Sequence, residues 1–496
     1  MTRMRMAGKF LVLFSPAWAL GASAAGCSAD DSASKDSGGT AEQAAVGAFL
    51  PNLQVSDPDL LDEAADAFAE VESINDGVGP IFNERACGNC HIEGAIGGAG
   101  PNTERRFGTF TANGFFDPLD ELGGTLRQLF SVGNFNNPNL PAGSRGRCQA
   151  GNPTLCCVPV EREPAQATVR NVGRLTTALF GLGLVDAMPD SFFDALAAAQ
   201  PAAIRGVVNR VPVFLPNPGD PSQGILTTRV GRFGWKAGVP TLLQFSADAY
   251  NNEMAITTQS CFRGSSINTF ALENAPNAPA GSFLDGCDDL APRQTGPNPG
   301  GLTAAQWAQV DDAVGACTGG RTEIQDDVFL FTVFMTALAP APRDFSDQIS
   351  INRGQPIFSN IGCAGCHVAT TFRTPATPPR IAIGTGEFIR VPGNFAFNPY
   401  SDFLKHGMGS LGDMIGDAPP DDPAQGLGDT VATTRQMRTA PLWGLRFRNR
   451  LLHDGRCSDV PCAVRAHDGQ GAAARNAFNA LSATSQHDLV QFVRSL

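Results

Sequence analysis

The chain has little positive charge for its length, few histidines and almost no tyrosine. Lysine and arginine number 36 against 48 aspartates and glutamates, so the formal net charge is −12. A chain this acidic is a poor candidate for binding nucleic acid. The same charge leaves room for a basic protein partner. Only 2 tyrosines occur, whereas glycine (55) and proline (36) are frequent, and this composition predicts long irregular loops.

Long apolar runs are missing beyond the first 25 residues. No later stretch holds 18 consecutive apolar residues, so we expect no membrane span. Basic residues precede an apolar stretch at 10–25, which predicts a secretory signal over 1–26. Small residues before Cys27 resemble a bacterial lipoprotein cleavage site and predict a lipid on Cys27, followed by a flexible tether at 27–48. The alternative is ordinary cleavage nearby, with Cys27 a free thiol. We expect an exported protein, periplasmic or anchored to the outer membrane through lipid alone.

The pentapeptide Cys-x-x-Cys-His occurs twice. It comprises Cys87, Cys90 and His91 in the first copy, and Cys363, Cys366 and His367 in the second. This spacing is the attachment signature of c-type haem, in which both sulfurs bond the porphyrin edge and the histidine binds the iron. A thioredoxin-like dithiol is the main alternative, but it would not need a histidine twice. A zinc site would need four closely grouped ligands. The sequence therefore predicts two covalently bound haem c groups.

The flanking residues indicate an internal duplication. The stretches 79–91 and 354–367 share Gly-x-x-x-Phe before the motif, and each predicts the first helix of a cytochrome c fold. In these stretches Phe82 and Phe358 would pack beside haem or simply in the core. Helical periodicity is found at 60–74, 191–208, 240–254, 303–314, 327–339 and 487–496.

These patterns predict a mainly α protein of two cytochrome c-like domains with long loop insertions. The N-terminal haem domain is expected at 49–345 and the C-terminal one at 346–496, with each haem motif at a helix start. A short strand is predicted at 211–216. The predicted loops or insertions are 132–165, 211–228, 264–302 and 369–400.

Eight cysteines remain once Cys27 and the two haem motifs are set aside. An even remainder in an exported chain predicts up to four disulfides. Their pairing stays open, although Cys457 and Cys462 are close enough to bridge each other. The others are Cys148, Cys156, Cys157, Cys261, Cys287 and Cys317.

The scarcity of histidine bears on the iron ligands. The chain has 6 histidines, and none lies between His91 and His367. The N-terminal haem therefore lacks a local second histidine, which favours an open iron that peroxide can reach. An iron with two protein ligands is instead an electron carrier. The remaining histidines are His406, His453, His467 and His487, of which His487 is expected at the surface.

The sequence resembles the bacterial di-haem cytochrome c peroxidase and MauG superfamily, and within it the di-haem oxidoreductase branch, often labelled thiol oxidoreductase. The resemblance extends over nearly the whole chain after the signal. It rests on the second haem motif and on 168–190, 232–254, 400–409 and 439–456. It implies that the N-terminal haem reacts with peroxide while the C-terminal haem, with two ligands, supplies electrons. The thiol label is not supported by the residues, because no free pair remains in the haem motifs; Cys156 and Cys157 are a vicinal pair elsewhere.

The resemblance also implies site residues. Trp235 would lie on the electron path, Gln244 would orient peroxide or water, and Glu253 would transfer protons. His453, in a His-Asp-Gly stretch, would face the same pocket. The alternatives are that Trp235 and Gln244 are core and helix-surface residues and that Glu253 is solvated.

The resemblance also implies ligands for the second haem and a further metal ion. His467, fourteen residues after His453, corresponds to the distal ligand of the second haem. His406 is the alternative distal ligand, and it could instead approach the first haem. Arg438 and Arg446 are candidate propionate partners. Relatives hold a Ca²⁺ between the domains, largely through backbone oxygens, so Ca²⁺ is a further candidate.

Three functions remain. The favoured one is reduction of H₂O₂ with electrons from a small cytochrome c or cupredoxin. A MauG-like oxidation of a protein or small molecule is the first alternative, and a di-haem electron-transfer protein without catalysis is the second. The chain is longer than ordinary di-haem peroxidases, and cysteine-containing insertions at 140–160 and 261–317 could cover a channel or build another substrate surface.

Overall fold

A computed structural model gives the structure of the chain. It describes residues 45–72, 78, 81–119, 124–131, 163–171, 173–217, 220–256, 323–382, 387–416 and 428–496, all within the compact unit Gly38–Leu496. The predicted signal peptide, Cys27, most of the tether, the helix at 303–314 and both cysteine-containing insertions lie outside these residues. In the part of the chain that is described, no helix has the length and apolar character needed to cross a bilayer.

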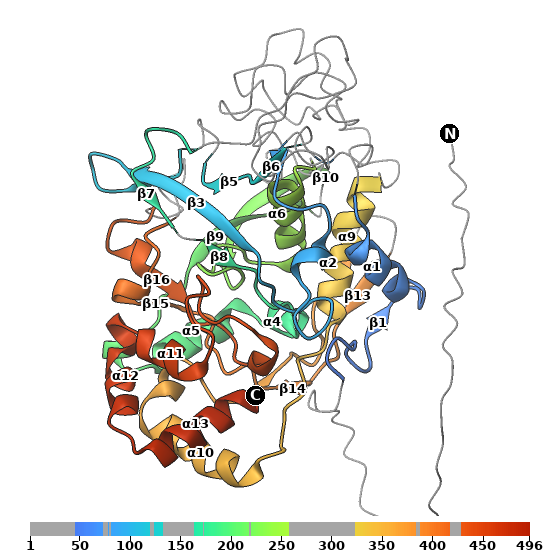
Figure 1. The fold of residues 1–496 in the computed structure, drawn as a ribbon. Coiled ribbons are helices and arrows are strands. Elements are labelled where there is room, and N and C mark those ends of the chain that lie inside the picture. The colour runs from blue at the N-terminus through green and yellow to red at the C-terminus, as the bar shows by residue number, and fades with distance from the viewer. Residues whose placement is uncertain are drawn as a thin grey trace, which may run out of the picture. The chain divides into compact units, whose positions relative to one another are not determined.

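Helices are found at most of the places where the sequence is periodic (Figure 1). The segment 60–74 forms a helix only to Ala69, and the helix predicted from residue 191 ends at Ala199. The helices are α1 (Leu60–Ala69), α2 (Cys87–Cys90), α4 (Leu182–Asp186), α5 (Asp190–Ala199), α6 (Leu242–Met254), α9 (Glu323–Ala337), α10 (Gln348–Asn360), α11 (Val460–Ala466), α12 (Ala472–Asn479) and α13 (Ala483–Arg494).

The expectation of a mainly α protein is wrong, because strands are distributed along the whole described chain. Most contain two or three residues, too few to give a period-2 signal in the sequence. The strands are β1 (Gln54–Val55), β2 (Ile81–Phe82), β3 (Thr103–Phe110), β4 (Phe116–Asp117), β5 (Leu126–Arg127), β6 (Phe130–Ser131), β7 (Val169–Arg170), β8 (Arg174–Leu175), β9 (Arg210–Asn217), β10 (Asp220–Val230), β11 (Phe372–Arg373), β12 (Ile381–Ala382), β13 (Phe388–Arg390), β14 (Ala396–Phe397), β15 (Lys405–Gly407) and β16 (Gln436–Arg438).

Strand β3 organises the largest sheet. It pairs with β4, β5, β7 and β8, each antiparallel to it. Strands β9 and β10 form an antiparallel hairpin over much of the segment 211–228, which we expected to be largely a loop. Strand β15 pairs with β16 and places Lys405 opposite Arg438. The fold is therefore a mixture of helices and small sheets.

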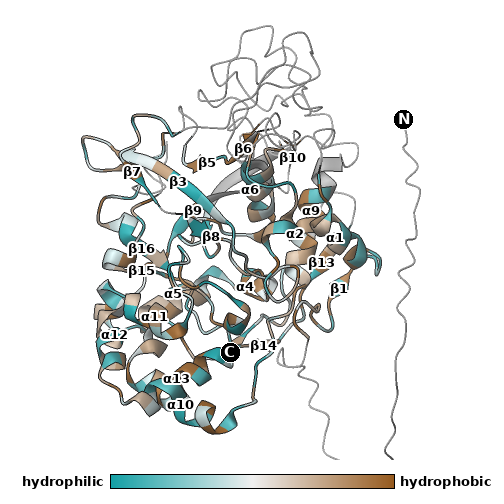
Figure 2. Ribbon diagram, viewed as in Figure 1, coloured by the Kyte–Doolittle hydropathy of each residue, from teal (hydrophilic) through white to brown (hydrophobic). Residues whose placement is uncertain are grey.

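The larger core is built on aromatic side chains between α1 and α9. Phe68 of α1 stacks on Phe334 of α9 with ring centres 4.3 Å apart, and both are buried. Figure 2 shows hydrophobic residues along α9. The same core extends to C-terminal residues such as Phe397 and Trp443. Burying one phenylalanine contributes about 1.5–3 kcal/mol, so this cluster accounts for much of the stability of the region.

A second core lies between α10 and α13. Phe358 packs against Phe492 at 5.3 Å and against Tyr400 at 6.1 Å. Residues of both expected domains also pair directly, because β1 is hydrogen-bonded to β13. The domain boundary at 345/346 stays a prediction.

The two haem motifs differ in their local structure. The cysteines of the first form the one-turn helix α2, but residues 81–86 before it contain β2 and not the expected helix. The second motif follows the end of α10 and begins with a 3₁₀ turn at Cys363–Gly365. The expected shared first helix is therefore present before the second motif only, within the described residues.

Candidate active site

A large apolar cavity adjoins the second haem motif. Its empty volume is about 1410 Å³, a figure that includes space open to solvent. Cys363, Cys366, His367 and His467 all line it. Leu411 and apolar side chains from the second core complete the wall; the latter include Phe358, Leu442, Val464, Leu489 and Val493.

His367 and His467 face each other across this cavity. Their ring centres are 6.4 Å apart. Two imidazoles that bind one metal ion through bonds of about 2.0–2.1 Å have ring centres roughly 6 Å apart. Nδ1 of His367 hydrogen-bonds the carbonyl oxygen of Tyr400 at 3.0 Å, and Nδ1 of His467 that of Ala463 at 2.8 Å. Both Nε2 atoms are thereby left for an iron.

His406 has a different environment. Its Nε2 lies 2.8 Å from a carboxylate oxygen of Asp402, which also accepts a hydrogen bond from Gln200 at 2.6 Å. Its Nδ1 lies 3.6 Å from Sγ of Cys366. Both ring nitrogens thus face protein partners, and the geometry favours His467 over His406 as the ligand opposite His367.

The first haem motif is closed by a glycine-rich loop. His91 lies 3.1 Å from the carbonyl oxygen of Gly98 through Nδ1, so its Nε2 is again left for an iron. Burial lowers the pKa of His91 to about 4, which keeps it in the neutral, metal-binding form at pH 7. A Cβ at Gly98 would lie 1.9 Å from the backbone oxygen of Glu93. The loop can therefore adopt this close approach only with glycine at position 98.

Three of the motif thiols, those of Cys87, Cys90 and Cys363, are poor nucleophiles. Burial raises the pKa of Cys90 and of Cys363 to about 12, and it raises that of Cys87 further. A redox-active dithiol needs a thiol pKa lowered towards neutrality. The described cysteines therefore disfavour a thioredoxin-like site.

Trp235 connects the two motif regions. A smaller cavity near the first motif is lined by Ala99, Gly100 and Phe245, and Trp235 lines both this cavity and the larger one. The indole N–H donates to the carbonyl oxygen of Leu175 at 2.8 Å, which fixes the ring. Trp235 therefore lies where the two cavities adjoin.

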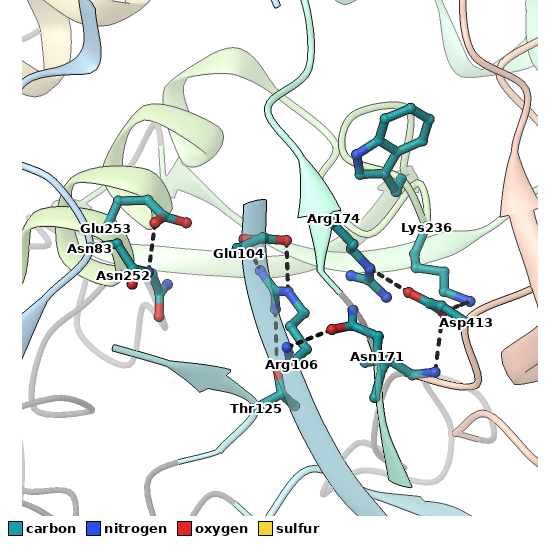
Figure 3. Close-up of polar contacts among 12 residues, drawn as sticks. Asn83, Glu104, Arg106, Thr125, Asn171, Arg174, Lys236, Asn252, Glu253 and Asp413 are labelled. Atoms are coloured by element: carbon teal, nitrogen blue, oxygen red, sulfur yellow. Dashed lines mark hydrogen bonds and ion pairs between the residues drawn. The ribbon is translucent and has the colours of Figure 1, made fainter. Parts of the chain in front are cut away.

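Glu253 ends α6 close to the first motif, and its carboxylate is among the groups that raise the pKa of Cys90. Asn83 donates to its Oε2 at 2.8 Å (Figure 3). Burial and the nearby Glu104 carboxylate raise the pKa of Glu253 to about 8. Glu104 itself is held ionised by Arg106, which donates to both of its oxygens at 2.9 and 3.0 Å. A half-buried carboxyl with a pKa near neutrality suits proton transfer.

Gln244 is not brought together with Glu253. Both belong to α6, and nine residues of an α-helix correspond to two and a half turns, so the two side chains point to opposite sides. Oε1 of Gln244 is buried and has no hydrogen-bond partner among the described residues. The expected joint pocket of Gln244 and Glu253 is therefore not formed here.

His453 lines the larger cavity, next to Trp235, and is not among the residues of the smaller one. Burial lowers its pKa to about 4, although Asp413 and Asp454 act in the opposite direction. A neutral imidazole at this place can accept or donate one hydrogen bond without carrying charge.

Comparison with known proteins identifies the family. The family model "di-haem oxidoreductase, putative peroxidase" matches residues 158–296 and 300–496. The chain belongs to the di-haem oxidoreductase family. No curated protein matched the chain. A solved structure, "Kuenenia stuttgartiensis Hydrazine Synthase Pressurized with 20 bar Xenon", is 18% identical with a TM-score of 0.22, and the match covers 36% of this chain and 56% of that one. So low a TM-score does not define the fold.

The described residues of this di-haem oxidoreductase fit haem as the group at both motifs. Each motif offers two sulfurs and one histidine whose Nδ1 is already hydrogen-bonded. The buried arginines add to the fit. Nε of Arg448 is buried and unpaired, and Arg448 and Arg438 line both cavities without an ion pair among the described residues. Two carboxylates, such as haem propionates, would complete them.

Arg446 is placed elsewhere. Its guanidinium donates to the carbonyl oxygen of Pro342 and lies over the ring of Phe447 at 4.3 Å. Arg438 remains a candidate propionate partner, whereas Arg448 was missed by the sequence reasoning. An arginine two residues after Arg446 carries no signal of its own, and only the folded chain shows which of the two faces the cavities.

Proposed function

We propose that this di-haem oxidoreductase carries two covalent haem c groups and reduces H₂O₂ at the N-terminal haem with electrons passed through the C-terminal haem. The observation that carries the proposal is the asymmetry of the two sites. His467 faces His367 at 6.4 Å, whereas the first motif has a half-buried carboxyl, Glu253, close enough to raise the pKa of Cys90. Two protein ligands favour electron transfer, and one leaves the iron reactive.

Two sets of residues would hold the two haems. Cys87, Cys90 and His91 would hold the first haem, and Cys363, Cys366 and His367 the second, with His467 as its other ligand. When bound, the haems supply the two electrons that reduction of H₂O₂ to two waters needs, and two protons must arrive with them.

Glu253 would move the proton at the peroxide site. Breaking the O–O bond requires that one oxygen lose a proton and the other gain one, and a single carboxyl can accept and return it. Its pKa of about 8 allows both steps near neutral pH. Asn83 fixes the carboxyl through its hydrogen bond to Oε2.

Trp235 would lie on the electron path and His453 beside it. The His453 ring is neutral at pH 7 and lies next to the indole of Trp235. It therefore adds no positive charge beside the proposed electron path. The net charge of −12 suits a basic electron donor, for which we propose a small cytochrome c or cupredoxin.

We further propose that the protein is exported and anchored to a membrane only through a lipid on Cys27. The basic, apolar and small residues of the first 27 positions support this location. Metabolic labelling with palmitate should mark the wild type and not a Cys27→Ala variant. A wild type that takes up no label would contradict the anchor.

Low-temperature EPR of the ferric protein, produced with c-type haem maturation, tests the main proposal. One high-spin and one low-spin haem, followed by peroxide consumption with a reduced cytochrome, would support it. Two low-spin haems that persist after partial reduction would favour an electron carrier. Peroxide consumption that oxidises an added protein or small molecule, without using a cytochrome donor, would favour MauG-like chemistry.

A further inference from the structure

A buried ammonium group lies beside Trp235. Lys236 follows Trp235 in the chain and is 5% exposed. Its Nζ donates to the backbone oxygens of Thr434 and, at 2.8 Å, Gln436, and it lies 3.0 Å from Oδ1 of Asp413. Backbone carbonyls and a carboxylate are the oxygens that Ca²⁺ uses in proteins. Here the oxygens of Thr434, Gln436 and Asp413 surround the Nζ atom of Lys236 and not a metal ion.

The carboxylate beside Nζ already serves two cations. Arg174 donates through Nε to the other carboxylate oxygen of Asp413 at 2.7 Å, so one buried carboxylate serves two cations (Figure 3). Burial acts to raise the pKa of Asp413, but Arg174 and Lys236 hold it well below its usual range. Burial lowers the pKa of Lys236 to about 8, which leaves it mostly protonated at pH 7. A divalent ion added among these oxygens would meet an ammonium and a guanidinium with a single negative charge between them.

The contacts of Lys236 join three segments that meet at Trp235. Asp413 belongs to the loop after β15, Thr434 and Gln436 lead into β16, and Lys236 holds both to its own loop. The backbone oxygen of Trp235 accepts a hydrogen bond from the N–H of Arg438 in β16 at 2.8 Å. Arg174 precedes Leu175, whose carbonyl binds the indole N–H. These contacts therefore restrain the segments around Trp235, which is one of the residues that line both cavities.

We propose that Lys236 is an internal cation that positions Trp235 between the two cavities, in place of the bound Ca²⁺ that the resemblance implies. The described oxygens beside Trp235 do not fit an additional Ca²⁺, because Nζ already lies among them. Lys236 acts through Trp235 and touches neither haem motif. The inference concerns metal content and the position of Trp235, so it stands or fails separately from peroxide reduction.

The first test measures metal on the whole haem-loaded protein. After dialysis against EGTA and then against buffer, elemental analysis should find no stoichiometric calcium, and added CaCl₂ should leave the melting temperature unchanged. One tightly held calcium per chain would overturn the proposal. So would a fall in melting temperature on EGTA treatment that CaCl₂ reverses.

The second test uses three variants. Lys236→Ala opens the space among the three oxygens, Lys236→Met fills it without charge, and Lys405→Ala removes a lysine that is also 5% exposed but pairs with Asp429 at 3.7 Å. We expect CaCl₂ to raise the melting temperature of Lys236→Ala and to restore its electron equilibration between the haems, followed by absorbance after partial reduction. Lys236→Met and the Lys405→Ala control should not respond to CaCl₂.

The pattern of responses decides the matter. A Lys236→Ala protein that equilibrates its haems as fast as the wild type without CaCl₂ would overturn the positioning role. Equal responses of Lys236→Ala and Lys405→Ala to CaCl₂ would show that the effect is not specific to the oxygens around Lys236, and would also overturn the proposal. If Lys236→Ala does not fold, Lys236→Met with slowed equilibration and the calcium content of the wild type decide in its place.

Discussion

The rings of Trp235 and His453 lie 6.2 Å apart at an interplanar angle of 68°, where the two cavities adjoin. The segments behind them are tied together as well, because the N–H of Leu175 donates to the carbonyl oxygen of His453 at 2.6 Å while the carbonyl of Leu175 accepts from the indole. Leu175 of β8 thus fixes the position of the Trp235 ring relative to the backbone of His453. Any change that frees the indole should therefore disturb the path between the haems.

Trp235→Phe tests this relationship. It keeps an aromatic ring but removes the hydrogen bond to Leu175, which should cost about 1 kcal/mol of unfolding free energy. We expect slower electron transfer from the C-terminal to the N-terminal haem, measured by rapid reduction followed by absorbance. Trp443→Phe is a matched control: Trp443 is 3% exposed, its indole nitrogen has no partner among the described residues, and it lines neither cavity. Equal transfer rates in the two variants would contradict the role of Trp235.

The choice between His467 and His406 gives a spectroscopic prediction. His467→Ala should convert the low-spin signal of the C-terminal haem into a high-spin one, since it removes the ring 6.4 Å from that of His367. His406→Ala should keep the low-spin signal but cost about 3 kcal/mol of stability, because Asp402 would lose its buried partner. EPR and thermal unfolding of both variants separate these effects. Loss of the low-spin signal in His406→Ala alone would reverse the ligand assignment.

The disulfide between Cys457 and Cys462 links the His-Asp-Gly loop to α11, and α11 ends at His467. Closing a loop of this short length contributes about 2 kcal/mol. A Cys457→Ser, Cys462→Ser double variant should lose that much in denaturant unfolding. It should also broaden the EPR signal of the C-terminal haem, because the start of α11 would be less restrained. An unchanged signal would show that packing alone positions His467.

Local signals in the sequence explain which features could be predicted. Helix α6 and the bridge between Cys457 and Cys462 depend on residues close in the chain, and both are present in the structure. The pairing of His367 with His467 as iron ligands was implied by a resemblance and stays a prediction, although the two rings lie 6.4 Å apart. The strand predicted at 211–216 is present in β9, whereas most other strands were missed because pairs such as β1 with β13 join segments more than 300 residues apart.

The buried charges show the same limit more sharply. Arg174 and Asp413 are separated by 239 residues, so nothing in the sequence near either one indicates their ion pair. Lys236 reads as an ordinary surface lysine beside a tryptophan until β16 is packed against it. The interpretation of Gln244 and Glu253 as one pocket failed for a related reason. Their order matched a pattern, but a continuous helix between them sets the direction of both side chains.

Glu253 makes peroxide turnover depend on pH. The carboxylate accepts the proton only when ionised, and its pKa of about 8 means that roughly one molecule in ten is ionised at pH 7. We expect kcat/KM for H₂O₂ to rise with pH and to level off above about pH 8. Glu253→Gln should remove this rise and lower kcat/KM by about 10²-fold or more. A variant with full activity and an unchanged pH profile would exclude Glu253 as the proton carrier.

Glu104 offers a second, more specific check on the same residue. Its carboxylate is a like charge that raises the pKa of Glu253, and Arg106 opposes that effect. Glu104→Gln removes the negative charge and leaves the guanidinium nearby, so the pKa of Glu253 should fall. The pH profile of kcat/KM should then keep its shape but move to lower pH, with higher activity at pH 7 than in the wild type. A profile that moves to higher pH would mean that a group other than Glu253 titrates, because loss of a neighbouring carboxylate cannot strengthen the binding of a proton to a carboxyl group.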